Sequence, residues 1–308
     1  MSMRELVVLG TSSAVPTKRR NHNGYFLRFD GEGVVVDPGE GTQRQMRLAG
    51  VSAHDVTRVC VTHFHGDHCL GLPGVVQWMA RDGVEREVPV VFPAAGYRYW
   101  ERLRAASWAV PAARVVAVPV AGEQSWVGAA TGLAVQALPL QHRVPTYGYR
   151  LVEPDGVRMV PELLERHGVG GPTVGRLQRQ GWVVNEVGQR VELAQVSRPR
   201  PGQVVAFVMD TEVCDNAVRL ARAADLLVIE STFLRSEEAL ARRYGHLTAE
   251  QAGQIAAAAG VRRVVLTHFS ERYGDGDDAR FAEEAARAFG GDIVVAADLD
   301  RVALPRRR

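Results

Sequence analysis

Short apolar runs rich in β-branched residues recur along the chain and predict buried strands. These runs are Leu6–Leu9, Val34–Val36, Val59–Val61, Val88–Phe92, Leu133–Leu138, Val204–Met209, Leu226–Ile229 and Val264–Leu266. The segments between them favour helices, at Thr42–Ala49, Leu70–Ala80, Gly96–Ala106, Asn216–Ala223, Ala249–Ala259 and Asp278–Phe289. Because strands and helices are mixed along the chain, the pattern predicts an α/β fold.

Two of the predicted strands end in the same tripeptide. Arg58–Phe64 and Arg263–Phe269 each consist of an apolar run followed by Thr-His-Phe. The similarity suggests two related halves whose equivalent edges face one site. Because the match is only a few residues long, chance recurrence of a strand pattern is the alternative interpretation.

Frequent glycines and prolines interrupt the pattern between Glu153 and Gly202. Such breaks prevent continuous packing, so we expect a single domain over residues 1–308 that carries a protruding insertion at 153–202. An ordinary long loop with a short helix at Glu162–His167 would have the same composition and is the alternative.

Composition and charge limit the classes of function. Of the 308 residues, 46% are hydrophobic, which is enough for a substantial buried core. The formal net charge of +2 excludes a strong global attraction to nucleic acid or to an anionic membrane. Any binding of a polyanion must therefore be local.

The cysteines and the N-terminus indicate where the protein works. The three cysteines, Cys60, Cys69 and Cys214, are odd in number and widely spread, which argues against a disulfide framework and fits a reducing compartment. The apolar run at Leu6–Leu9 is too short for a signal-peptide core, and no apolar run approaches the ~18 residues that span a bilayer. We expect a soluble, cytoplasmic protein that does not bind membranes.

The strongest chemical signal is a cluster of metal ligands directly after one predicted strand. His63, His65, Asp67 and His68 fall within six residues, and Gly66 permits the tight backbone path that this crowding needs. Imidazole and carboxylate ligands without cysteine are typical of an open catalytic zinc site, with manganese or iron as alternatives. Burying these groups at one strand end without a metal would be costly.

Further candidate ligands end other apolar runs, namely His142, Asp210 and His268. With the cluster they are enough for two metals bridged by an aspartate and a water, a site that hydrolyses phosphodiesters, esters or amides. Asp37 also ends a strand, where it could hydrogen-bond a ligand imidazole or cap a turn. The isolated histidines, His22, His54 and His167, are interpreted as surface or hydrogen-bonded residues.

Together these residues resemble the metallo-β-lactamase superfamily. The resemblance covers essentially the whole chain and implies a four-layer αβ/βα sandwich. Within the superfamily, four blocks are most similar to ribonuclease Z, the endonuclease that trims the 3′ trailer from precursor tRNA. Two of these blocks are Asp37–Gln43, which resembles the first family motif, and Tyr147–Arg150, which follows His142 as in the family.

A third block, Pro16–Asn21, resembles a family loop that is thought to sense the tRNA 3′ end. The resemblance makes Lys18, Arg20 and Asn21 candidate substrate-binding residues. Lys18 is the only lysine of the chain, as if a compact ammonium group were needed there, although chance survival is the alternative.

The fourth block, His246–Ala252, contains a capping-box pattern at Thr248 and Gln251, so His246 lies just before a helix N-terminus that favours a phosphate. By resemblance His246 donates a proton to the departing 3′-oxygen, and Asp67 acts as ligand and proton acceptor. One position departs from the family: Ile229 stands where relatives carry a histidine, so Glu230 must act without it.

The insertion also resembles part of the family. Gly170-Gly171-Pro172 matches the Gly-Pro centre of the family's tRNA-binding arm, but the arm has no lysines here. Phosphate contacts would fall to its arginines, Arg158, Arg166, Arg176 and Arg179.

The resemblance implies a zinc-dependent endoribonuclease with two Zn2+ per subunit, with Mn2+ or Fe2+ as other options. It would act as a homodimer on precursor tRNA and leave a tRNA 3′-hydroxyl and a trailer 5′-phosphate. A small-molecule esterase, lactonase or cyclic-phosphodiesterase of the same superfamily is the alternative enzyme, and it would need neither the arm nor the Lys18 loop. A non-catalytic RNA-binding module is a third possibility, which the complete set of ligands argues against.

Overall fold

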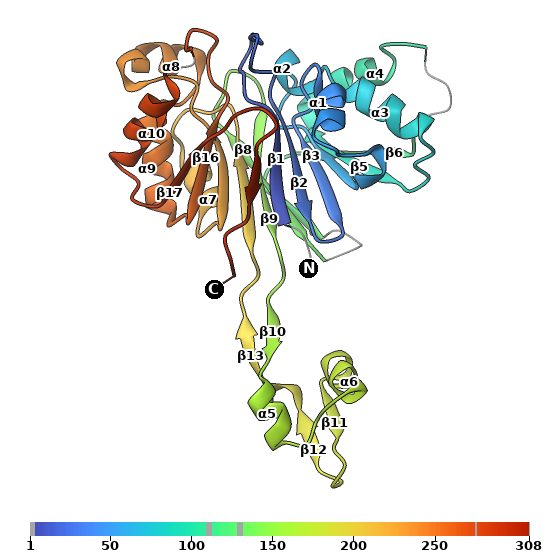
Figure 1. Ribbon diagram of the computed structural model, residues 1–308. Coiled ribbons are helices and arrows are strands. Elements are labelled where there is room, and N and C mark those ends of the chain that lie inside the picture. The colour runs from blue at the N-terminus through green and yellow to red at the C-terminus, as the bar shows by residue number, and fades with distance from the viewer. Residues whose placement is uncertain (1–3, 109–112, 128–131, 275, 308) are drawn as a thin grey trace. The chain divides into compact units, whose positions relative to one another are not determined.

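The computed structural model describes residues 4–108, 113–127, 132–274 and 276–307, and its elements are labelled in Figure 1. The chain forms two compact units. The first contains the residues up to Val152 together with Val204–Pro305, and the second contains Glu153–Gln203 with Arg306 and Arg307 of the C-terminal tail.

The first unit contains two seven-stranded sheets. One sheet has the order β18-β1-β2-β3-β4-β5-β6, in which β18 to β3 are antiparallel neighbours and β3 to β6 are parallel. Its strands are β1 (Arg4–Gly10), β2 (Gly24–Phe29), β3 (Glu32–Val36), β4 (Arg58–Cys60), β5 (Val88–Pro93), β6 (Val115–Val120) and β18 (Arg301–Ala303).

The other sheet has the order β17-β16-β15-β14-β9-β8-β7, in which β14 to β17 are parallel and β7, β8 and β9 are antiparallel. Its strands are β7 (Gln124–Val127), β8 (Ala134–Leu140), β9 (Thr146–Val152), β14 (Val204–Val208), β15 (Leu226–Glu230), β16 (Arg263–Thr267) and β17 (Asp292–Val295). Each sheet thus combines a parallel and an antiparallel part.

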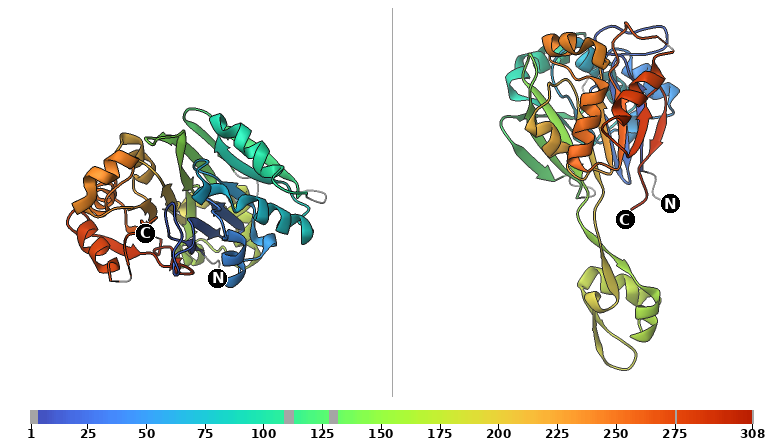
Figure 2. Two further views of the ribbon diagram at one scale, coloured as in Figure 1. Left: turned by 90° about the horizontal axis from the view of Figure 1, so that it is seen from above. Right: turned by 90° about the vertical axis from the view of Figure 1, so that its left-hand side faces the viewer.

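Helices cover the outer faces of both sheets, and the view from above in Figure 2 shows these layers. Helices α1 (Thr42–Leu48), α3 (Leu72–Arg81) and α4 (Tyr97–Arg104) pack on the first sheet, and α7 (Asp215–Ala221), α9 (Ala249–Ala259) and α10 (Asp278–Ala286) pack on the second. A core between the sheets takes side chains from both. The predicted four-layer αβ/βα sandwich is therefore confirmed.

The sequence of β14 explains why the central strands are continuous apolar runs. Val205 and Phe207 belong to the core between the sheets, whereas Ala206 and Val208 belong to the core under the helices. Successive side chains of a strand point to opposite faces, so a strand covered on both sides needs apolar residues at every position.

All eight predicted apolar runs lie in strands and extend at most one residue beyond them, but the pattern missed others, among them β2 and β9. One predicted helix, Leu70–Ala80, corresponds to α3, which follows a separate short helix α2 (Gly66–Cys69). Helix α8 (Glu238–Tyr244) was not predicted. In the described parts of the chain, no helix has both the length and the apolar composition needed to cross a bilayer.

The second unit is a small fold with its own core. It consists of two strand pairs, β10 (Gly156–Met159) with β13 (Ser197–Arg200) and β11 (Trp182–Val184) with β12 (Arg190–Glu192), and two helices, α5 (Pro161–Arg166) and α6 (Pro172–Gln180). Its buried side chains are Val169, Leu177, Val183, Val191 and Val196. This segment is therefore a packed unit despite its glycines and prolines.

Candidate metal centre

The candidate ligands follow the carboxyl ends of strands from both sheets. The loop after β4 carries His63 and His65, and the short helix α2 that follows carries Asp67 and His68. The remaining candidate ligands come after β8, β14 and β16 and are His142, Asp210 and His268. The two Thr-His-Phe segments therefore follow strands of different sheets, and their histidines, His63 and His268, both belong to the candidate site. Nε2 of His68 lies 3.1 Å from Nε2 of His268.

The seven predicted ligands form two neighbouring groups, and a third group combines two of them, Asp210 and His268, with His246. His63, His65, His142 and Asp210 each offer one atom to a group whose atoms lie within 4.8 Å of one another, and Asp67, His68 and His268 form a second such group. Asp210 lies between the two groups. Its Oδ2 is 3.4 Å from His63 Nε2, and its Oδ1 is 3.3 Å from His68 Nε2.

Hydrogen bonds fix the orientation of the imidazole rings. His142 Nδ1 donates to the carbonyl oxygen of Gly245 at 2.7 Å. The Thr232 hydroxyl donates to Glu230 at 2.6 Å, so it can accept from His268 Nδ1 at 2.8 Å. With the proton held on Nδ1, each ring directs the lone pair of Nε2 toward Asp210.

Asp37 plays the same part for His68. Its Oδ2 accepts from His68 Nδ1 at 2.8 Å, and its Oδ1 accepts from the backbone N–H of Thr62 at 2.7 Å. The prediction that Asp37 accepts a hydrogen bond from a ligand imidazole is confirmed. Asn23, whose amide nitrogen lies 3.1 Å from His68 Nδ1, was missed because no motif surrounds it.

The donors at this site suit metal ions. His142 Nε2 and Asp210 Oδ1 are buried, and neither has a hydrogen-bond partner among the described residues. Burial alone would raise the pKa of Asp210, but His268, His68 and His63 hold it well below its usual range. A buried carboxylate surrounded by imidazole rings is typical of a cation site, and the nitrogen and oxygen donors fit a divalent metal. The protein thus uses a metal cofactor.

His246 lies at the edge of these groups and is paired with Glu230. Its Nδ1 donates to Glu230 Oε1 at 3.0 Å and lies 4.0 Å from Asp210 Oδ2. Burial lowers the pKa of His246, but Glu230 and Asp210 outweigh this effect and raise it to about 9. The predicted capping box follows directly, since Thr248 accepts from Gln251 N at 3.3 Å.

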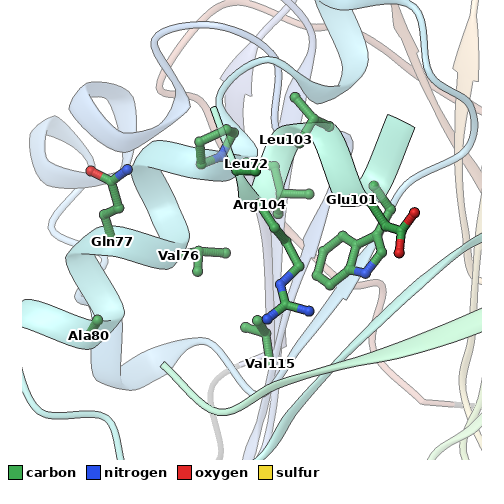
Figure 3. Close-up of a pocket in the computed structure, with 11 residues that line it drawn as sticks. Leu72, Val76, Gln77, Ala80, Glu101, Leu103, Arg104 and Val115 are labelled. Atoms are coloured by element: carbon green, nitrogen blue, oxygen red, sulfur yellow. The ribbon is translucent and has the colours of Figure 1, made fainter. Parts of the chain in front are cut away.

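The site opens into a cleft with a volume of about 580 Å³ that is lined by Asp67, His142, Asp210, His246 and His268 among others. His22 also lines the cleft, where its Nε2 lies 3.3 Å from the carbonyl oxygen of Ala14. A separate pocket of about 350 Å³ lies between α3 and α4 and contains none of the candidate ligands (Figure 3). The chemistry therefore belongs to the cleft.

Comparison with known proteins places this geometry in a family. Residues 17–106 match the family model described as the metallo-beta-lactamase superfamily, and residues 181–269 match the model described as a beta-lactamase superfamily domain. A ribonuclease Z from Thermobifida fusca is 64% identical over 308 residues, which is 100% of this chain and 97% of the relative. The chain belongs to the ribonuclease Z family. The predicted family and class of enzyme are confirmed.

Other comparisons agree with the assignment. A ribonuclease Z from Salinispora arenicola is 56% identical over 100% of this chain and 98% of its own length. The crystal structure of the short form of human tRNase Z matches with a TM-score of 0.66 at 22% identity, over 98% of this chain and 100% of the other. Full-length similarity to ribonuclease Z proteins disfavours the small-molecule hydrolase as an interpretation.

The ribonuclease Z loop at Pro16–Asn21 is held mainly by internal contacts. Arg20 donates to the Thr11 hydroxyl at 2.8 Å and to Asp278 at 2.6 Å. Asn21 donates through its side chain to the carbonyl oxygen of Glu40 at 2.8 Å. Lys18, in contrast, is exposed. Arg20 and Asn21 thus hold the loop against neighbouring segments of the chain, whereas Lys18 lies on its surface.

Although Ile229 stands where the family resemblance implies a histidine, the neighbouring Glu230 is fully hydrogen-bonded. Ile229 is buried in the core under α9, whereas Glu230 accepts from the backbone N–H groups of Thr211 at 2.8 Å and Leu247 at 3.1 Å, in addition to His246. Glu230 therefore needs no histidine beside it to stay ionised, and its pKa is lowered by His246 despite the opposing effect of burial.

The candidate arm residues lie in the second unit. Arg176 and Arg179 are exposed on α6, and Arg176 donates to the Thr173 hydroxyl at 3.0 Å. They are not part of the metal-centre cleft.

Proposed function

We propose that this ribonuclease Z family member removes the 3′ trailer from precursor tRNA in the cytoplasm, leaving a tRNA 3′-hydroxyl and a trailer 5′-phosphate. The observation that carries the proposal is the pair of ligand groups joined at Asp210, with the Glu230–His246 pair beside them. Members of both ligand groups line one cleft together with His246, which supports a shared site. The family relationship supports RNA as the substrate.

The metal is best assigned as two Zn2+, held by His63, His65, His142 and Asp210 in one group and by Asp67, His68 and His268 in the other, with Asp210 between them. Mn2+ and Fe2+ have similar ligand preferences and remain alternatives. Bound there, such ions would supply an activated water at neutral pH and offset the negative charge of the phosphate.

Asp67 is suited to act as a ligand and to orient the attacking water. It is largely buried, which alone would raise its pKa, but His68 and His268 hold the pKa far below its usual range. It is therefore a carboxylate throughout the working pH range and accepts a hydrogen bond from the water.

His246 is suited to protonate the leaving 3′-oxygen. Its Nδ1 is fixed on Glu230, so Nε2 is the nitrogen that can deliver a proton to the substrate. The raised pKa of His246 keeps the ring charged at neutral pH, which favours its role as the acid.

We also propose that the protein forms a homodimer, as the family resemblance implies. Trp108 is fully exposed and follows α4 closely, and Leu103 and Arg104 of α4 line the pocket between α3 and α4 (Figure 3). A fully exposed tryptophan, three residues after Ala105 of this pocket, suits an interface between two copies. Sedimentation of the wild type and of Trp108→Ser tests this, and a dimer that survives the substitution places the interface elsewhere.

The deciding experiment is incubation of the purified holoenzyme with a 3′-extended tRNA precursor, followed by mapping of both product ends. We expect one cut that leaves a 3′-hydroxyl on the tRNA and a 5′-phosphate on the trailer. His68→Ala should lose bound metal and roughly several orders of magnitude in rate, because it removes a ligand. The exposed His54 supplies the control, since His54→Ala should keep both. No cleavage by the wild type, or normal cleavage by His68→Ala, contradicts the proposal.

A further inference from the structure

The cleft contains side chains that are not candidate ligands. Tyr244, Phe233, Arg143 and Arg272 line it together with His246. Tyr244 is the last residue of α8, which is labelled in Figure 1, and Arg143 lies in the loop between β8 and β9. None of these side chains has a role in the steps described above.

Tyr244 is held in a defined position beside His246. The next residue, Gly245, ends α8 with a left-handed backbone (φ 74°), and its carbonyl oxygen accepts from the ligand His142 at 2.7 Å. The ring of Tyr244 lies almost parallel to that of Phe233, with centroids 6.4 Å apart and an angle of 15° between the planes. Phe233 is only 4% exposed, whereas Tyr244 is 37% exposed. A buried ring thus supports an exposed one at the cleft.

Arg143 provides a positive charge at the same place. It follows His142, and its Cγ would lie 3.5 Å from a Cβ built on Gly245. Among the residues that the structure describes, none forms a hydrogen bond or ion pair with the exposed guanidinium of Arg143. Arg272 differs, since it donates to Glu237 at 2.9 Å and to Ser270 at 3.2 Å. Arg143 is therefore the arginine of this cleft that is available to a ligand.

We propose that Tyr244 and Arg143 form a nucleotide subsite beside His246. Tyr244 stacks on the base of the nucleotide whose 3′-oxygen leaves, and Arg143 hydrogen-bonds a phosphate oxygen of the same strand. The inference rests on the proposed function, because the position of the nucleotide follows from the role of His246 as the acid. A proton donor must lie against the leaving oxygen. Tyr244 lines the same cleft as His246, and the rings of both lie beside Phe233, with centroids 6.4 Å and 6.2 Å from it, so Tyr244 is placed to contact the nucleoside that carries this oxygen.

The chemistry of the two side chains fits this substrate. An aromatic ring stacks on any base, so the subsite would accept tRNAs that differ at this nucleotide. A guanidinium binds phosphate oxygens through a planar set of N–H donors. A guanidinium without a protein partner gives up only hydrogen bonds to water when it binds a phosphate. The metal centre binds the scissile phosphate but cannot itself position the adjoining base.

The stacking contact is tested with two precursors that carry either the normal base or an abasic ribose at the nucleotide whose 3′-oxygen leaves. The wild type should cleave the base-bearing precursor with a kcat/KM roughly 5- to 150-fold above that of the abasic one. Tyr244→Leu should lose most of this preference, because its kcat/KM falls only on the base-bearing precursor. Tyr244→Phe should retain the preference, since the ring remains.

A structural role for Tyr244 would give a different result, because Tyr244→Leu would then lower cleavage of both precursors equally. If Tyr244→Leu loses kcat/KM equally on both precursors, or keeps the wild-type preference for the base-bearing precursor, the stacking assignment is overturned while the proposed function stands. Failure of the wild type to cleave either precursor overturns both. Arg242→Gln, a change of an exposed arginine on the same helix, is the matched control and should keep the wild-type preference.

The phosphate contact is tested through the salt dependence of precursor binding. Arg143→Gln should flatten the slope of log affinity against log salt by roughly 0.7–0.9, the value for one lost phosphate contact. Arg143→Lys should keep most of the slope, and Arg242→Gln should leave it unchanged. A slope that is unchanged in Arg143→Gln, or that is flattened as much in Arg242→Gln, overturns the assignment of Arg143.

Discussion

Three residues of the metal centre have a left-handed backbone that is unusual for residues other than glycine. They are Asp37 (φ 48°), Asp210 (φ 39°) and His268 (φ 62°). Each follows a strand within two residues, and such a conformation costs about 1–3 kcal/mol per residue. The sequence predicted these residues because they end apolar runs. It could not predict the backbone, because no glycine marks it.

The Glu230–His246 pair makes a prediction about pH. The raised pKa of His246 means that the ring is protonated below about pH 9 and loses its proton above this value, so a step that needs the acid slows on the alkaline side. Glu230→Gln removes a charge that favours the protonated ring. The alkaline limb of kcat/KM for precursor cleavage should therefore move to lower pH. An unchanged limb would show that Glu230 does not control the proton of His246.

His246→Ala tests directly whether His246 is the acid. It should keep both metals and the affinity for precursor while slowing the chemical step by ~10²–10⁴-fold, because the leaving oxygen lacks its acid. A substrate whose leaving group needs no protonation should regain much of the rate. Loss of metal from this variant would instead identify His246 as a ligand, since it also lies close to Asp210 and His268.

At the scale of the elements, the strands that the sequence revealed are those built from continuous apolar runs. Strands such as β14 are covered on both faces and appear as continuous apolar runs. In β9, polar and small residues (Thr146, Gly148, Arg150) alternate with larger apolar ones, so a search for continuous apolar runs missed this strand. Arg150 lies in this strand because its guanidinium donates to the backbone carbonyls of Leu220 and Arg222, contacts that no local pattern contains.

The capping box at the start of α9 was predicted from the sequence and has a testable cost. Thr248 is almost fully buried and accepts from the backbone N–H of Gln251, so Thr248→Ala should lower the free energy of unfolding by about 0.5–2 kcal/mol. Urea unfolding of the metal-loaded protein measures this loss. The chemical step should slow as well, because the cap fixes the turn that carries His246. Glu238→Gln on the neighbouring α8 should change neither quantity appreciably.

For the whole molecule, the resemblance to metallo-β-lactamases predicted the sandwich, but the internal structure of the second unit could not be predicted. Its core is built from side chains such as Leu177 and Val191, which stand between polar residues, and Val183, which stands in an apolar run of only three residues. They come together only through the pairing of β11 with β12 and the packing of α6. Local periodicity carries little information about contacts of this kind.

The final prediction concerns the second unit, which we propose binds tRNA. Gly156 and Arg200 are paired residues of β10 and β13, so a short Gly/Ser linker can replace the segment between them without straining the first unit. This variant should bind precursor tRNA more weakly, and its slope of log affinity against log salt should flatten by roughly 0.7–0.9 per lost phosphate contact. Hydrolysis of bis(p-nitrophenyl) phosphate should continue, because this substrate needs only the metal centre.

A milder variant separates charge from fold in the same experiment. Changing four exposed arginines of this unit to glutamine leaves its core intact and should reproduce much of the loss of affinity and of salt dependence; these residues are Arg158, Arg166, Arg176 and Arg179. If the linker variant loses both activities equally, the second unit supports the fold of the first. If both variants cleave precursor tRNA normally, the unit does not hold tRNA. Loss in the linker variant alone would mean that the unit binds tRNA through groups other than these four arginines.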